Sequence, residues 1–329
     1  MHIRRPSSAS TRARLVAGLA LLLWAAAVLA AQPFPAKPIS LWVPFAAGGI
    51  TDSAARIVAR RLGEELGQPV IVENRAGGGG RIGASEFARA PADGHTLMFA
   101  NSVIYALLPA SIGGLRFDPG RDFAPLGLLS SYTTVLVCHP AVPFSDVAGL
   151  VSYAKRNPGA LSFATAGAGS GNHFTSELFN LKAGVQTLSV HYRGNAPALQ
   201  DVMAGVVQCS HASEVKAFVD AGKLKALATA GQSRDPRFPD LPTIAEAGVP
   251  GFQLEWWQGV VAPAGTPQPV VQRLVAALKS VANDPRVRAE TVGLGLAVDY
   301  GTPDDFKARM AQDQATFKRV VHDARLTLE

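Results

Sequence analysis

The sequence predicts an α/β fold, with one or two mostly parallel sheets that carry helices on both faces. Short apolar runs alternate with amphipathic stretches along most of the chain, which is the pattern of repeated strand and helix units. Proline and glycine stand where elements end, as in RNPGAL and VPGF, where a helix cannot continue. With 329 residues and 48% hydrophobic content, the chain is long enough for one large or two medium domains.

The elements follow in order from residue 39. The strand ISLWVPF leads into a helix that starts at Ser53, and PVIVEN leads through a glycine loop into the helix IGASEFARA. The later strands are TLMFAN, VLVCHP, LSFATA, LSVHY, VVQCS and LKALATA, and the later helices are DVAGLVSYAKRNPG, HFTSELFNLKAG, APALQDVMAG and EVKAFVDAGK. The last quarter differs, because it holds two helical blocks, and the second begins with a capping box between Thr302 and Asp305.

Residues 1–31 are typical of a secretory signal peptide. Four arginines precede an apolar run over residues 15–31, which is short for a membrane-spanning helix and ends in alanines suited to cleavage. We therefore expect export of the protein and removal of this segment. An uncleaved N-terminal anchor is the alternative, and the length and flanks of the run make it the weaker one.

Charge and cysteine content narrow the classes of partner. Without residues 1–31 the chain carries 27 basic and 25 acidic residues, and no basic patch interleaved with aromatics follows, so we expect no nucleic-acid partner. No cluster of Cys and His has metal-ligand spacing, so no metal or other cofactor is expected. Cys138 and Cys209 each end a β-branched run; the sequence leaves their pairing open and favours two separate buried thiols.

A glycine run after VIVENRA matches the dinucleotide fingerprint G-x-G-x-x-G at Gly78, Gly80 and Gly83. An NAD site also needs an acid about 20 residues further on, where this chain has Asn101 and Ser102. An exported protein would also lack a pool of the cofactor. We therefore expect a tight loop that needs positive φ angles rather than a cofactor site.

Two strand–glycine–helix turns stand out as candidate ligand sites, residues 46–52 in PFAAGGITD and residues 165–173 in FATAGAGSGNHF. Free backbone N–H groups and the positive end of a helix dipole make such a turn suited to an anion. The first turn lacks the Lys-Ser/Thr of a nucleotide-binding loop, and its only charge is Asp52. Both turns are expected at C-terminal strand ends, where they could face one another across a cleft, and plain turn chemistry is the alternative for each.

Ser170 is the nearest approach to a catalytic nucleophile in the sequence. It lies between Gly169 and Gly171 but not in a G-x-S-x-G elbow, so we expect Ser170 and Asn172 to cap the helix or to bind a ligand. His173 is expected as a packed or capping side chain. A secreted hydrolase that uses Ser170 is the rival function from another class.

Ten blocks in order resemble the periplasmic solute-binding receptors of tripartite tricarboxylate transporters, the TctC-like or Bug proteins. These blocks cover nearly the whole chain after the signal: FPAKPISLWVPFAAGGITD, GQPVIVENRAGGGGRIGA, PADGHTL, DFAPLGLL, VLVCHPAVP, LSFATAGAGSGNHF, HYRGNAPAL, AGKLKALA, LPTIAEAGVPGF and WWQGVVAPAGTP. Their order makes the resemblance specific, whereas any one glycine motif would not be.

The resemblance implies a two-domain periplasmic-binding-protein (Venus-flytrap) fold that closes on a small ligand. Domain 1 would comprise residues 37–133 plus 252–329, and domain 2 residues 134–251. The protein would be a receptor rather than an enzyme, a monomer in the periplasm, and would serve inner-membrane subunits (TctA/TctB-like) or a sensor. A receptor for an ABC-type importer is the rival within binding proteins.

The resemblance also implies the ligand and its contacts. The family binds mostly small carboxylates, from citrate and related acids to amino acids and aromatic acids, and grips them with the two turns singled out above. We expect main-chain donors from the first turn, hydrogen bonds from the second, apolar walls on either side, and Asp52 as a brace for its own helix or a bridging water. The predicted shell is Phe45, Gly48, Gly49, Ile50, Thr51, Asp52, Asn101, Ser102, Thr165, Ser170, Gly171, Asn172 and Tyr192.

One segment departs from the family pattern. After VVQC, relatives carry an acid or Asn and a proline-containing turn, whereas this chain reads SHASEVKAF and is about two residues shorter. The change leaves the ligand's identity open. Ser210 and His211 are therefore added as candidate specificity residues, with an ordinary strand-to-helix turn as the alternative.

Overall fold

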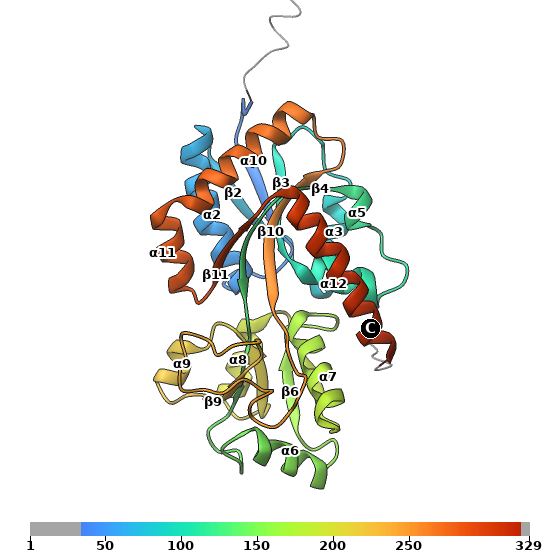
Figure 1. Cartoon of the computed structure of the whole chain (residues 1–329), viewed down its shortest axis with the longest axis vertical. Coiled ribbons are helices and arrows are strands. Elements are labelled where there is room, and N and C mark those ends of the chain that lie inside the picture. The colour runs from blue at the N-terminus through green and yellow to red at the C-terminus, as the bar shows by residue number, and fades with distance from the viewer. Residues whose placement is uncertain (1–33, 324–329) are drawn as a thin grey trace, which may run out of the picture.

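The structure, a computed structural model, describes residues 34–323, so the predicted signal peptide lies outside the described residues. Two sheets divide this part of the chain between two lobes (Figure 1). The larger sheet lies in the upper lobe and has the strand order β11-β4-β10-β3-β1-β2. Its strands are β1 (Ile39–Val43), β2 (Val70–Asn74), β3 (Thr96–Asn101), β4 (Phe123–Tyr132), β10 (Trp256–Pro263) and β11 (Ala297–Gly301).

The smaller sheet lies in the lower lobe of Figure 1 and has the order β7-β6-β8-β5-β9. Every strand in it comes from one continuous stretch of the chain. These strands are β5 (Val135–Cys138), β6 (Ser162–Thr165), β7 (Leu188–His191), β8 (Cys209–Ala212) and β9 (Lys225–Thr229). They are covered by α6 (Val147–Arg156), α7 (Gly171–Ala183), α8 (Asn195–Met203) and α9 (Lys216–Asp220).

Helices from both ends of the chain cover the upper sheet. α2 buries Ile57, Val58 and Leu62 on one face and ends at Gly67, whose φ of 72° lets its N–H bond the carbonyl of Gly63. The helical elements of this lobe are α2 (Ile50–Leu66), η1 (Gly78–Gly80), α3 (Arg81–Phe87), η2 (Val103–Leu107), α4 (Leu108–Ser111), α5 (Pro119–Asp122), α10 (Gln268–Asn283), α11 (Pro285–Gly293) and α12 (Pro303–Asp323). Among residues 34–323, none of the helices is both long and apolar enough to cross a membrane.

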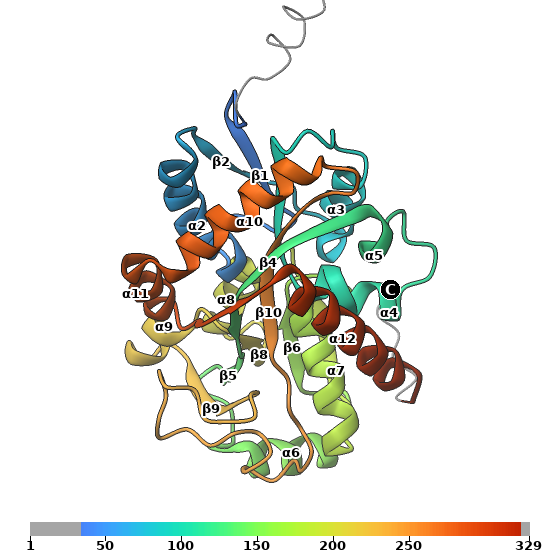
Figure 2. The ribbon, with the colours of Figure 1, turned by 45° about the horizontal axis from the view of Figure 1, so that its top comes forward.

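Two long strands join the lobes. β4 and β10 pair antiparallel, with the last residue of β4, Tyr132, opposite the first residue of β10, Trp256, and this end of the pair lies toward the lower lobe in Figures 1 and 2. Beyond this pair the Thr133 hydroxyl donates to the Leu254 carbonyl (3.4 Å), and the Leu254 N–H donates to Ala230 (2.8 Å). The chain therefore crosses between the lobes twice at one place, through two adjacent extended segments.

The predicted α/β two-lobed fold is confirmed, but the sheets are mixed rather than mostly parallel. β1 pairs in parallel with β2 and β3, and β6 with β7 and β8, as the strand–helix alternation predicts. The antiparallel pairs all involve β4, β5 or β10, the strands that lead into or out of the crossing. A strand that enters a sheet from the neighbouring lobe runs against the others, which the local sequence pattern does not reveal.

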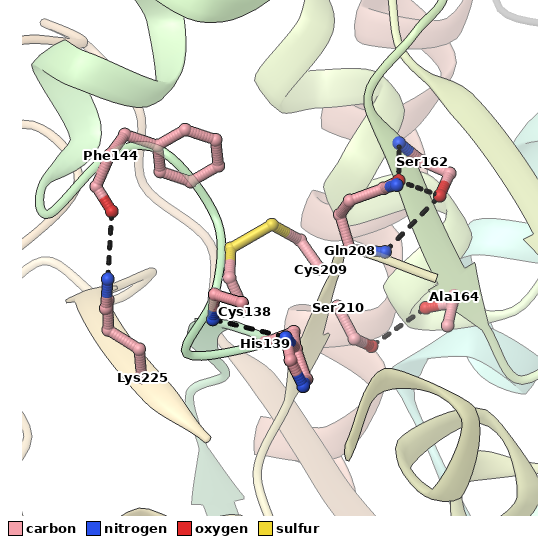
Figure 3. Close-up of a disulfide and its surroundings, with 10 residues drawn as sticks. Cys138, His139, Phe144, Ser162, Ala164, Gln208, Cys209, Ser210 and Lys225 are labelled. Atoms are coloured by element: carbon pink, nitrogen blue, oxygen red, sulfur yellow. Dashed lines mark hydrogen bonds between the residues drawn. A yellow bond between two sulfur atoms is a disulfide. The ribbon is translucent and has the colours of Figure 1, made fainter. Parts of the chain in front are cut away.

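The prediction of two separate thiols is wrong, because Cys138 and Cys209 form a disulfide (Figure 3). β5 and β8 pair antiparallel in a register that sets the two cysteines directly opposite, with a Cα–Cα distance of 3.9 Å. Both residues are fully buried. The bond closes a sequence separation of 71 residues and links two neighbouring strands of the lower sheet.

Candidate functional site

A cavity of about 560 Å³ lies between the two lobes. It is lined by the loops after β1 and β2 in the upper lobe and by the loops after β6, β7 and β8 in the lower one. These loops all follow the C-terminal ends of strands, where α/β sheets bind ligands. The volume is that of a site for a small organic molecule.

Besides the short α3, three helices of nine or more residues begin at this cavity. Ile50 is the first residue of α2, Gly171 of α7 and Asn195 of α8, and all three line it. The first N–H groups of a helix have no acceptor within the helix, and the helix dipole is positive at that end. The convergence of three such ends gives the cavity a preference for negative charge.

The upper loop, residues 46–52, is capped by glycine alone. Gly49 is the N-cap of α2 and supplies no side-chain hydrogen bond. The Gly48 N–H donates to Asp52 Oδ2 (2.9 Å), and the Ile50 N–H donates to Glu214 Oε1 in the lower lobe (2.6 Å). The N–H groups of Gly49 and Thr51 have no hydrogen-bond acceptor among the described residues, so both are open to a ligand.

Asp52 braces this loop. Its buried carboxylate accepts from Gly48 N, from Asn74 Nδ2 (2.9 Å) and from Arg56 Nε (3.0 Å). Burial raises the pKa of Asp52, but the hydrogen bonds from Arg56, Gly48 and Asn74 outweigh that effect and hold the pKa below its usual value. The expected brace is therefore present, although its partners are the loop, β2 and the second turn of α2 rather than the first N–H groups of the helix.

The lower loop, residues 165–173, satisfies its own backbone. Ser170 is the N-cap of α7 and its hydroxyl accepts from the His173 N–H (3.4 Å). Asn172 Oδ1 accepts from Ala166 N (2.9 Å), and His173 Nδ1 accepts from Gly169 N (3.1 Å). Burial, together with the neighbouring His191, lowers the pKa of His173 to about 4, so its imidazole is neutral and able to accept that bond.

A line of polar side chains joins the two loops. Asn172 Nδ2 donates to Asn195 Oδ1 (2.9 Å), and Asn195 Nδ2 donates to Glu214 Oε1 (3.3 Å). Glu214 in turn accepts from Ile50 of the upper lobe. The lower lobe therefore reaches the N-terminus of α2 through a carboxylate.

The upper lobe supplies a second polar group to the cavity. Asn101 Nδ2 lies 3.1 Å from the hydroxyl of Tyr132 and 3.5 Å from that of Thr51, while its Oδ1 accepts from Val103 N (3.2 Å). All three of these polar side chains line the cavity. Burial raises the pKa of Tyr132 well above its usual value, so its hydroxyl stays protonated and can donate.

The lobes are in contact at the mouth of the cavity. Gly79 has a φ of 65°, and a Cβ placed on it would lie 2.8 Å from the carbonyl oxygen of Ala168 in the lower lobe. A Cβ placed on Gly194 would lie 3.2 Å from that of Ala46. The structure is therefore a closed form, and its closure depends on glycine where the two backbones meet.

Most of the predicted shell lies at this cavity, and four members do not. Gly48 is exposed and donates to Asp52, and the hydroxyls of Ser102, Thr165 and Ser210 contact Trp257 N, His191 Nδ1 and the Ala164 carbonyl instead. The predicted residues that line the cavity are Phe45, Gly49, Ile50, Thr51, Asp52, Asn101, Ser170, Gly171, Asn172, Tyr192 and His211.

His211 does not extend a polar group toward any protein partner. Its ring is fully buried and stacks on Phe163 (5.4 Å between centroids), and neither ring nitrogen has a hydrogen-bond partner among the described residues. Burial lowers its pKa to about 3, so the ring is neutral. It is mainly a core side chain at the edge of the cavity.

Sequence reasoning missed Glu214, Asn195 and the wall formed by residues 77–80. HYRGNAP is a third strand–glycine–helix turn, so the pattern that found the other two could have found Asn195. Glu214 lies inside the segment that departs from the family, where the sequence analysis predicts Ser210 and His211 as the specificity residues. The glycines at 78–80 have positive φ angles, as expected, but they also form a wall of the cavity.

No group of three or more His, Cys, Asp or Glu side chains within residues 34–323 could hold a metal ion. The charged side chains at the cavity are Asp52, Arg81 and Arg193, with Glu214 at its edge. Together with the hydrogen-bonding groups described above, these side chains can hold a ligand through hydrogen bonds and charge.

Comparisons with known proteins agree with this geometry. The family model TctC, described as tripartite tricarboxylate transporter family receptor, matches residues 54–326. A protein of Pseudomonas sp. (strain P51), described as the UPF0065 protein in the tcbD-tcbE intergenic region, is 37% identical over 320 residues, which are 96% of this chain and 95% of that relative.

Solved structures are similar over nearly their whole length. R. palustris Rpa4515 with adipate has a TM-score of 0.86 at 33% identity and covers 89% of this chain and 99% of its own. MatC (Rpa3494) from Rhodopseudomonas palustris with bound malate has a TM-score of 0.83 at 34% identity and covers 88% of this chain and 100% of its own. The periplasmic binding protein BugD has a TM-score of 0.85 at 32% identity and covers 89% of this chain and 99% of its own. The resemblance read from the ten sequence blocks is confirmed, and this chain belongs to the TctC family of tripartite tricarboxylate transporter receptors.

Proposed function

We propose that this protein is a periplasmic receptor that closes over a small carboxylate in the cavity between its lobes. The observation that carries the proposal is the convergence of the N-termini of α2, α7 and α8 on one cavity between the lobes. Relatives of the same fold were solved with adipate and with malate, which supports the same ligand class for this chain. Free N–H groups at Gly49 and Thr51 and the hydroxyl of Tyr132 would hold the carboxylate.

We further propose that the lobes divide at residues 133/134 and 251/252 and that the receptor acts as a monomer. The membership of the two sheets supports this division, because the lower sheet uses only strands between Val135 and Thr229. The ligand would pass to TctA/TctB-like subunits of the inner membrane or to a sensor, a role that rests on the family alone.

The contacts of Ser170 favour a receptor over a hydrolase. Its hydroxyl lies 2.5 Å from the carbonyl of Gly167 and 2.8 Å from Asn172 Oδ1, and it accepts from His173 N. A serine nucleophile needs a base at its hydroxyl, and Nδ1 of His173, the histidine in the same turn, instead accepts from Gly169 N. Ser170 is held as a helix cap.

A thermal-shift screen tests the proposal. The protein is unfolded and refolded to remove co-purified ligand, then heated with malate, adipate, citrate, aspartate and benzoate. A ligand at 100 times its Kd should stabilise the fold by about 2.7 kcal/mol, and calorimetry then gives the Kd. If none of the carboxylates shifts the melting temperature, the proposed ligand class is wrong.

Gly79→Ala connects the ligand to closure of the cleft. The added Cβ would press on the Ala168 carbonyl and hold the lobes apart, so we expect ligand affinity to fall about tenfold or more. Gly159→Ala is the matched control, because its φ of 75° brings the same backbone strain while nothing lies within 4 Å of the new Cβ. Equal affinities of the two variants would argue against binding by closure.

A further inference from the structure

We propose that Glu214 is a built-in carboxylate, which seats on the N-terminus of α2 and holds the cleft closed until an external carboxylate displaces it. The latch itself is a property of the ligand-free protein. The displacement rests on the proposed function, so the two parts are tested separately below.

The position of Glu214 carries the argument. It lies in the turn between β8 and α9 of the lower lobe, yet its Oε1 accepts from the Ile50 N–H of the upper lobe at 2.6 Å. This N–H is one of the donors that the sequence predicts for the ligand. The protein thus shows, with one of its own side chains, that this helix end accepts a carboxylate.

The other contacts of Glu214 fix its side chain in the position from which it reaches the Ile50 N–H. Oε2 accepts from Ser213 N (3.2 Å) and Ser213 Oγ (3.0 Å), and Asn195 Nδ2 lies 3.3 Å from Oε1 and 3.4 Å from Oε2. All of these partners belong to the lower lobe. The bond to Ile50 is therefore the one hydrogen bond from Glu214 that joins the lobes among the described residues.

The negative charge of Glu214 is stabilised by the same groups that would stabilise the carboxylate of a ligand. No lysine, arginine or histidine within residues 34–323 forms an ion pair with it. The nearby acid Asp52 is neutralised by Arg56 and faces Gly48 instead. Glu214 relies on neutral N–H donors and the dipole of α2, which is the arrangement that holds anions reversibly at helix ends.

Two consequences follow from this arrangement. Without ligand, the closed form has a lobe-to-lobe bond that a receptor with an empty cleft would lack, so the closed population is larger. With ligand, a second carboxylate near Ile50 meets Glu214, and like charges at that distance repel. The ligand must displace Glu214, and its apparent affinity is lowered by the strength of the latch.

Small-angle X-ray scattering of the ligand-free protein tests the latch without any ligand. We expect Glu214→Ala and Glu214→Gln to have a larger radius of gyration than the wild type, with Ala the larger of the two because Gln can still accept a weaker bond. Asp220→Asn is the matched control, since it removes one negative charge from exposed α9 nearby and should scatter like the wild type. Identical curves for all four proteins would overturn the latch.

Ile50→Pro removes the donor rather than the acceptor. Proline is accepted at the first position of a helix, and the extended Gly49 (φ −81°, ψ 168°) suits a residue before proline. Ile50→Val keeps the N–H and serves as the control for the lost side chain. We expect Ile50→Pro to expand like Glu214→Ala and the double variant to expand no further; additive expansion would mean that the two residues do not act through one bond.

Calorimetry with malate and aspartate tests the displacement. Glu214→Ala removes the carboxylate that competes with the ligand, so this variant should bind malate about tenfold more tightly than the wild type. Ile50→Pro should not increase the affinity for malate. If Glu214 instead pairs with an ammonium group of the ligand, Glu214→Gln will weaken aspartate and leave malate unchanged, and the displacement is wrong. If neither acid binds any variant, the proposed ligand class fails, while scattering still decides the latch.

Discussion

The loops at residues 46–52 and 165–173 follow the same pattern of strand, glycine turn and helix, yet they are completed in opposite ways. The lower loop closes its hydrogen bonds with its own Ser170, Asn172 and His173. The upper loop is capped by Gly49, and two of its N–H groups are filled by carboxylates, one of them from the other lobe. A side-chain cap uses N–H donors at the start of a helix, whereas a glycine cap leaves these donors available to an anion.

The difference shows how a receptor can bind an anion without lysine. A capped helix end has few donors left, so the lower loop contributes shape and the amide of Asn172. The upper loop keeps its donors because, within residues 34–323, Asp52 is the one side chain of its own lobe that accepts from them. Because these roles belong to different lobes, the proposed ligand would contact both sets of groups only when the lobes lie close together.

Asp52→Ala should have the largest effect, because the upper loop depends on this one side chain. Its loss removes the hydrogen bonds that Gly48 N, Asn74 Nδ2 and Arg56 Nε make to a buried carboxylate, and bonds to a charged group of this kind contribute about 2 to 3 kcal/mol to the free energy of unfolding. We also expect weaker binding with the same order of preference among ligands. Denaturant unfolding and calorimetry measure the two effects.

Asp118→Ala is the control for that variant. Asp118 caps α5 through Gly120 N and Arg121 N, is not a lining residue of the cavity, and should cost about 1 kcal/mol with no change in affinity. If Asp52→Ala reverses the order of ligands, Asp52 contacts the ligand directly and is more than a brace.

Acid should weaken the lower loop next. The pKa of His173 is about 4 in the folded protein and near 6.5 when unfolded, so only the unfolded chain gains its proton between these values. The contribution of His173 is therefore constant above about pH 6.5 and destabilises by about 2 to 3 kcal/mol as the pH falls to about 4. Urea unfolding of the wild type from pH 7.5 to pH 4 should show this decline.

His173→Gln separates this effect from His211, which shifts in the same direction. Gln can accept the hydrogen bond from the Gly169 N–H without titrating, so the variant should lose less stability on acidification. The part of the loss that is due to His211 should remain. Parallel pH curves for the two proteins would show that His173 is not the titrating group.

Ser170→Ala should have the smallest effect of the three. Loss of the cap of α7 costs about 1 kcal/mol, and its neighbour Asn172 loses a partner, so carboxylate affinity should fall a few-fold. Thermal unfolding and calorimetry give both values. Ester turnover by the wild type that disappears in this variant would contradict the receptor and support the hydrolase.

The sequence predicted correctly the features that depend on residues close together in the chain. The turns at Gly49 and Ser170, the positive φ angles of the glycine loop and the capping box of Thr302 and Asp305 depend on residues a few positions apart, and the structure contains all of them. The order of ten blocks predicted the family. These features need no knowledge of which strands become neighbours.

What the sequence could not supply depends on pairing over long distances. Asn101 and Ser102 are adjacent, yet only Asn101 reaches the cavity, because β3 ends at Asn101 and the backbone of Ser102 is already helical, which turns its hydroxyl toward Trp257 N. Cys138 meets Cys209 through the register of β5 and β8. Glu214 is 164 positions from Ile50, and only the closed arrangement of the lobes brings them together.

The disulfide also makes the pair of strands β5 and β8 in the lower lobe more rigid. β5 begins directly after the crossing segment at Thr133, and the bond from Cys138 fixes it to β8, whose far end leads to Glu214. Two strands bonded in this way cannot slide past one another. The bond therefore joins the crossing segment to the strand that carries Glu214, so the position of this carboxylate is tied to that of the crossing.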